Sequence, residues 1–138
     1  MYLRRYAALA VGMAGVLSVV GCTDTAGIAA LDRAPASDDQ LPDYVLTQGV
    51  DVDSVRKVAE RDEVMYFISD SETDEGHCVI QVRVPDATIW AVVCGTGNVV
   101  TNRTTGIVTT VALVTDGYSV EDLGMEGWTK IHTNLFTH

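Results

Sequence analysis

The chain has few basic side chains. Nine Lys and Arg residues stand against nineteen Asp and Glu residues, which gives its 138 residues a formal charge of −10. A surface this acidic repels phosphate backbones and anionic lipid headgroups, so we expect no nucleic-acid partner. The charge does not identify a cationic partner, because acidic surfaces commonly serve solubility alone.

Common catalytic and metal-binding motifs are also missing. The chain contains no HExxH or GxSxG pattern, and its three histidines lack the spacing of zinc ligands. Three carboxylates alternate in residues 70–76 as in a calcium loop, but Glu75 and Gln81 occupy positions where an EF-hand needs Gly and Glu. We expect a protein that is not an enzyme and has no cofactor or metal. An ion site in residues 70–76 is the alternative to a solvated loop.

No apolar run has the length of a membrane-spanning helix. The longest, residues 7–20, is shorter than the roughly 20 residues that such a helix needs. It follows a short basic start with Arg4 and Arg5 and ends in small residues. This order is typical of a secretory signal peptide. We therefore predict that residues 1–21 are a helical signal peptide that is removed on export.

The apolar run ends in Val19-Val20-Gly21-Cys22, which resembles the lipobox of bacterial lipoproteins. In that family the Cys thiol receives a diacylglyceryl group, and the signal is cut immediately before it; Leu is usual where Val19 stands. The resemblance implies that Cys22 is lipidated and holds the chain in the bilayer, at the outer face of the cytoplasmic membrane. Two acyl chains anchor a protein firmly where one does not. The alternative is an ordinary secretory signal with an incidental Cys.

The predicted mature chain divides into a tether and one domain. Its 117 residues carry seven basic and nineteen acidic side chains, a formal charge of −12. Residues 22–43 contain several acids together with Pro35 and Pro42, and they show no sustained apolar period. Such a segment cannot bury enough surface to fold alone, so we expect a flexible, disordered tether. Residues 44–138 are then a single exported domain.

Short β-type runs separated by turns make up the domain. The runs that favour strands are residues 54–60, 64–68, 77–84, 88–94, 107–115 and 129–136. A helix is the alternative for residues 54–60. Residues 119–122 indicate one capped helical turn, closed by Gly124. Short strands at this spacing predict a mainly β fold, a small antiparallel meander that forms a sandwich or a half-open barrel.

Two cysteines remain when Cys22 carries lipid, and an exported protein with one such pair is expected to form one disulfide. Paired residues of an antiparallel hairpin have a constant sum of positions. A loop at residues 85–87 fixes that sum at 172, which is also the sum for Cys78 and Cys94. Alternation places both cysteines on one face with Trp90, and we predict that this face forms the core. A redox role is disfavoured, because CxxC spacing is absent.

Candidate ligand contacts are Tyr118 and Trp128, which flank the predicted helical turn; filling the core is the alternative role for such aromatics. Anchor, tether and cysteine hairpin together resemble the small lipoproteins of Gram-positive envelopes. We expect a non-catalytic binding or accessory module with an envelope protein as partner. A small-molecule-binding or ion-binding lipoprotein is the alternative.

Overall fold

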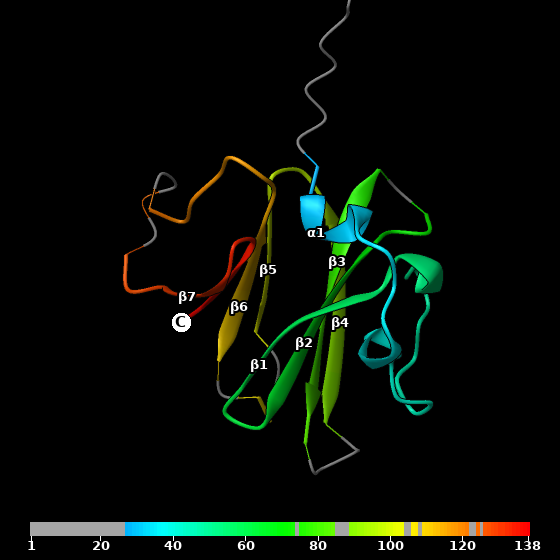
Figure 1. Cartoon of the computed structure of the whole chain (residues 1–138). Coiled ribbons are helices and arrows are strands. Elements are labelled where there is room, and N and C mark those ends of the chain that lie inside the picture. The colour runs from blue at the N-terminus through cyan, green and yellow to red at the C-terminus, as the bar shows by residue number, and fades with distance from the viewer. Residues whose placement is uncertain are drawn as a thin grey trace, which may run out of the picture.

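The computed structural model of the chain describes residues 27–73, 75–84, 89–103, 106–107, 109–121, 124 and 126–138. Two four-stranded antiparallel sheets pack face to face (Figure 1). The predicted mainly β, antiparallel fold is therefore confirmed. None of the helices in the described ranges is long and apolar enough to cross a membrane. The predicted signal peptide and Cys22 lie outside the described residues.

The first sheet has the order β1-β2-β3-β4. Its strands are β1 (Arg56–Arg61), β2 (Val64–Asp70), β3 (Gly76–Arg83) and β4 (Trp90–Thr96). Asp62 and Glu63 join β1 to β2 with φ angles of 51° and 62°. Two successive left-handed residues are the signature of the hairpin turn that matches strand twist. The four strands correspond to four of the predicted runs.

The second sheet has the order β5-β6-β8-β7 and departs from prediction in two places. Its strands are β5 (Val99–Arg103), β6 (Thr110–Val114), β7 (Thr129–His132) and β8 (Leu135–Thr137). Strand β5 was not among the predicted runs. The prediction of a single strand over residues 129–136 is wrong, because the chain reverses at Thr133 and Asn134 and His132 then pairs with Leu135.

The main core lies between the two sheets. Tyr66, Ile68 and Val79 of the first sheet pack there against Leu113 and Leu135 of the second. On β3, the inter-sheet face carries Val79, which is the opposite face from Cys78. The prediction that the cysteine face forms the core is therefore wrong in one respect. That face is buried, but the second sheet packs on the other face. Both faces of β3 are apolar, so alternation alone cannot identify which one meets the other sheet.

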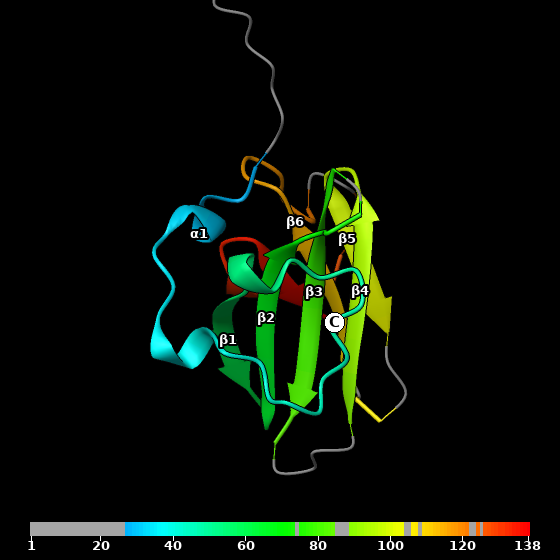
Figure 2. The same ribbon diagram turned by 90° about the vertical axis from the view of Figure 1, so that its right-hand side faces the viewer.

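Residues 41–55 cover the cysteine-bearing face of the first sheet. Val45, Val50 and Val55 pack there against Phe67 and Ile80. Figure 2 shows this segment crossing in front of β2, β3 and β4. A bridge between Val50 and Ser71 ties the segment to the end of β2. The cover explains why a sheet of a small domain is apolar on both faces.

The chain is already folded from residue 27 onward. Helix α1 (Ala29–Asp32) and the 3₁₀ turns η1 (Ser37–Asp39) and η2 (Val52–Ser54) precede β1. Ile28 is 4% exposed and belongs to the inter-sheet core. The prediction of a disordered tether over residues 22–43 is therefore wrong for residues 27–43, and the domain does not start at residue 44. The other residues of the predicted tether, 22–26, are not described.

Asp39 holds this segment on the first sheet. Its Oδ1 accepts hydrogen bonds from Arg33 Nη2 and from the backbone N of Lys57, at 2.6 and 2.7 Å. Its Oδ2 accepts from Arg33 Nη1 and the backbone N of Ala36, both at 2.7 Å. Chiefly because of the Arg33 guanidinium, the pKa of Asp39 lies far below its usual value. The carboxylate is buried and fully satisfied, so an acid that indicated a solvated tether is a folding contact.

Candidate functional site

A cleft of about 440 Å³ opens on the outer face of the second sheet. Its walls are the loop that follows β6 and the β7–β8 hairpin. The described lining residues are Thr115, Asp116, Gly117, Tyr118, Ser119, Val120, Glu121, Trp128, Lys130, Thr133, Asn134 and Phe136. This volume lies within the range of small-molecule sites in proteins. Tyr118 and Trp128, the aromatic pair singled out from the sequence, line this one cleft.

Val120 and Phe136 line the cleft and belong to a small apolar cluster. Ala112, Val114 and Phe136 point outward from β6 and β8, and Val120 folds back onto them. Trp128 packs against this cluster and against the His138 ring, with ring centroids 5.5 Å apart. His138 is itself fixed by two backbone hydrogen bonds to Thr110. The cluster therefore rests on the sheet rather than on the loop alone.

Asp116 and Asn134 fix the upper wall. Asn134 is buried, and its Nδ2 donates to Val114 O at 3.0 Å and to Asp116 Oδ1 at 2.7 Å. Asp116 Oδ2 accepts from the backbone N of Ala29 at 2.7 Å. The backbone N of Asp116 donates to Gly27 O at 2.8 Å. These contacts occupy the amide and the carboxylate, so both groups position the wall rather than stand free for a ligand.

The side chains that remain free to contact a ligand at the cleft are an aromatic ring, a cation and an anion. Tyr118 is 42% exposed, and Lys130 and Glu121 are exposed. Within the described ranges neither charged side chain forms an ion pair. Ser119 Oγ accepts from the backbone N of Glu121. This set suits a compact ligand with an apolar face and an acceptor for the ammonium group.

His132 stands behind the same hairpin. Its Nδ1 accepts a hydrogen bond from the backbone N of Asn134 at 3.3 Å, which requires the nitrogen to be unprotonated. Burial lowers the pKa of His132 below its ordinary value, and the nearby Lys130 and Arg33 lower it further, whereas Asp116 opposes the shift. Histidine at this position is therefore neutral near pH 7 and shapes the turn that carries Asn134.

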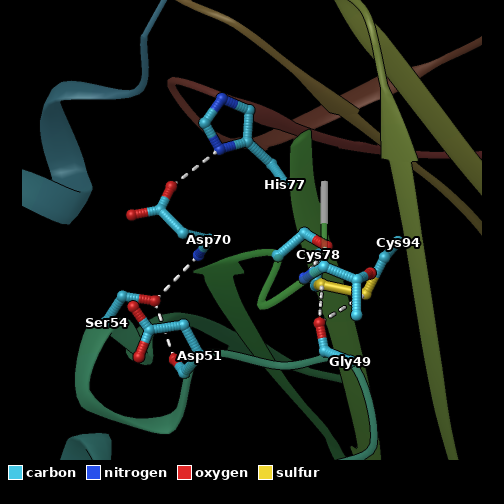
Figure 3. The surroundings of a disulfide bond; sticks show 9 residues. Gly49, Asp51, Ser54, Asp70, His77, Cys78 and Cys94 are labelled. Carbon is cyan, nitrogen blue, oxygen red and sulfur yellow. Dashed lines mark hydrogen bonds and ion pairs between the residues drawn. A yellow bond between two sulfur atoms is a disulfide. The ribbon is translucent and has the colours of Figure 1, made fainter. Parts of the chain in front are cut away.

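The disulfide between Cys78 and Cys94 confirms the predicted pairing. The two residues are directly opposite in the β3–β4 ladder, and Val82 faces Trp90 in the same register. Gly49 O lies 3.6 Å from both sulfur atoms (Figure 3). Disulfide sulfurs carry no proton, so this is a packing contact rather than a hydrogen bond. Residues 41–55 therefore cover the disulfide on the cysteine-bearing face of the first sheet.

The acidic loop at residues 70–76 is tied to its surroundings at several points. Figure 3 shows Asp70 Oδ1 beside His77 Nδ1, at 3.1 Å, and the backbone N of Asp70 bonded to Ser54 Oγ. The backbone N of Glu72 donates to Gly49 O. No group of three metal-ligating side chains occurs among the described residues; Asp74 is not one of them.

A second hollow, of about 530 Å³, lies among residues 35–55. Its walls include Leu41, Val45 and Val55, together with the carboxylates of Asp39 and Asp53. Asp39 is already saturated by four donors. None of the described residues that line this hollow carries an aromatic ring or a positive charge. It offers fewer kinds of contact than the cleft beside β6, although it is larger.

Sequence reasoning missed Asp116, Lys130 and Asn134 as parts of the cleft. They converge only because the chain reverses at residues 133–134, and no Gly or Pro marks that turn.

Comparison of the chain with protein-family models, with curated proteins and with solved structures finds no match.

Proposed function

We propose that the chain is a lipid-anchored envelope protein whose folded domain is a non-catalytic binding module, and that the cleft lined by Tyr118 and Trp128 is its ligand site. The single observation that supports the site most is the convergence of an exposed Tyr, a half-buried Trp and an unpaired Lys130 in one hollow.

The anchor part of the proposal depends on the N-terminal sequence. A basic start, an apolar run and Val19-Val20-Gly21-Cys22 occur in the order of a lipoprotein signal. A diacylglyceryl group on Cys22 gives stable attachment, because each buried methylene contributes about 0.8 kcal/mol.

The binding part depends on chemistry that the fold leaves unused. Burying an aromatic ring of a ligand against Tyr118 and Trp128 removes apolar surface from water and adds ring–ring contact worth about 1 kcal/mol. Lys130 supplies a donor at the edge of the cleft. A small molecule, or a side chain of a partner protein, that presents an apolar face and an acceptor matches this arrangement.

Tyr118→Ala in the lipidated chain tests the site. A thermal-shift screen of small molecules on the wild type supplies ligands, and each hit is repeated on the variant. Tyr44→Ala is the matched control, because Tyr44 is 40% exposed and lies away from the cleft. We expect the shift to disappear in Tyr118→Ala and to persist in Tyr44→Ala. Hits that survive Tyr118→Ala unchanged would place binding elsewhere and contradict the proposed site.

A further inference from the structure

We infer that the folded domain is seated on the membrane, with the end that carries Gly27 and residues 116–118 docked on the headgroup layer. This inference depends on the proposed lipid anchor at Cys22. It concerns an interaction surface, and its partner is the zwitterionic headgroup layer of the bilayer.

The chain between the anchor and the domain is short. Only residues 23–26 separate Cys22 from Gly27. Five successive Cα–Cα steps reach at most about 18 Å, whatever conformation those residues adopt. The polar layer beyond the hydrocarbon is itself about 6 Å thick on each side of a bilayer. Gly27 therefore lies within a few ångströms to about 1 nm of the headgroups.

Gly27 cannot detach from the domain, and so lengthen this connection, without a cost in free energy. Its carbonyl accepts a hydrogen bond from the backbone N of Asp116, and Ala29 N donates to the Asp116 carboxylate. Ile28, between them, is buried in the inter-sheet core. Releasing this residue would expose an isoleucine side chain, which costs about 2 kcal/mol. The connection stays short because the domain itself begins at this point.

A domain of this size has an outer radius of roughly 17 Å, so reaching its far side from Gly27 requires roughly 50 Å of chain. The available 18 Å or so is much less. The domain cannot invert on such a connection, and Figure 1 shows that the described part of the chain begins beside α1, at one end of the sheets. The turn between β1 and β2 lies at the other end, because β1 runs its whole length away from α1.

The surface beside Gly27 carries one side chain that suits the headgroup layer. Tyr118 is among the most exposed large apolar side chains and lies two residues beyond Asp116. Tyrosine rings favour the headgroup level of membranes. Asp116 and Glu121 give the same rim negative charge. Zwitterionic headgroups are therefore preferred to anionic ones, which would repel the rim over a Debye length of about 8 Å.

The test uses the mature lipidated protein in phosphatidylcholine vesicles that carry a nitroxide on some headgroups. One cysteine is added and labelled with a fluorophore; Cys78 and Cys94 are disulfide-bonded and do not react. Asp32→Cys places the label at the end of α1. Arg61→Cys places it at the far end of β1 and is the matched control, since both positions are exposed. We expect several-fold stronger quenching at residue 32 than at residue 61.

A second variant checks the cause. A Gly-Ser insertion of about fifteen residues after Ala26 adds a coil of roughly 20 Å, which should largely equalise the two positions. Equal quenching at residues 32 and 61 without the insertion would overturn the docked orientation while leaving the anchor intact. Failure of the protein to float with vesicles would overturn the anchor and, with it, this inference. Stronger quenching at residue 32 in phosphatidylglycerol vesicles than in phosphatidylcholine would overturn the stated headgroup preference.

Discussion

The Asp116 carboxylate accepts a hydrogen bond from the backbone N of Ala29 at 2.7 Å, joining residues 87 positions apart. The same carboxylate accepts from Asn134 Nδ2 at 2.7 Å, at the wall of the cleft. One side chain therefore connects the beginning of the folded domain with its candidate ligand site. A ligand that orders the Asp116 wall would also hold Gly27 and Ile28 in place.

Replacing Asp116 should loosen this connection. Asp116→Ala removes the acceptor of Ala29 N and of Asn134 Nδ2, and hydrogen bonds to an exposed charged group of this kind support a loss of about 1–2 kcal/mol. Hydrogen exchange at the Ala29 amide should become faster in the variant. Asp32→Ala, another exposed acid near the same helix, is the control and should leave that exchange rate unchanged.

Asp39 should contribute more to the stability of the fold than its neighbour Asp38, although both lie in η1. Asp39→Ala leaves Lys57 N and the Arg33 guanidinium without their acceptor, so we expect a loss of about 2–3 kcal/mol in the free energy of unfolding. Asp38 is exposed, and Asp38→Ala should be close to neutral. Urea unfolding of the two variants measures the difference, and equal stability would show that residues 33–39 do not hold the fold.

The Asp39 carboxylate should also make the free energy of unfolding depend on pH, in a direction that its pKa fixes. The pKa of Asp39 is lower in the folded chain than in the unfolded chain. Its contribution to stability is therefore complete above its ordinary value of 3.8 and falls as the pH drops below that value. The stability of the wild type should decline more steeply below about pH 4 than that of Asp39→Ala. Parallel curves would contradict the assigned contacts.

His132 should cause a second decline in stability, at a higher pH than the decline caused by Asp39. Its folded pKa is lowered from 6.5 because burial disfavours the charged ring. The unfolded chain thus takes up the proton first, so stability is complete above pH 6.5 and decreases as the pH falls below it. His132→Gln should remove this part of the decline. Unfolding free energies of the wild type and the variant at pH 7.5 and 5.5 provide the comparison.

The disulfide closes a separation of 16 residues. A loop of this length contributes about 3 kcal/mol, so Cys78→Ala/Cys94→Ala should melt lower by roughly 10 °C. The melting temperature of the wild type in reductant should fall to a similar value. An unchanged melting point in the variant would contradict a structural role for the bond.

The hairpin of β3 and β4 could be predicted from sequence because its determinants are local. A short turn fixes the sum of paired positions, and that sum alone placed Cys78 opposite Cys94. The main core face could not be predicted in the same way. Residues 41–55 pack on the Cys78 side and the second sheet on the Val79 side, so both faces are apolar and alternation carries no information about which is which.

Residues 27–43 and the cleft were beyond local reasoning for a related reason. Asp39 is an ordinary acid in the sequence, and only the fold brings the backbone N of Lys57 to it. Thr133 and Asn134 have no strong turn signal, yet the reversal there brings Lys130 and Asn134 to the wall that Tyr118 and Trp128 share. The aromatic pair was recognisable because both residues flank one short loop.

The intact mass of the protein extracted from the membrane fraction tests the central claim, the lipid anchor, most directly. We expect the mass of residues 22–138 increased by a diacylglyceryl group, with Cys22→Ala absent from that fraction. A membrane-fraction mass equal to the bare residues 22–138 would contradict the anchor at Cys22.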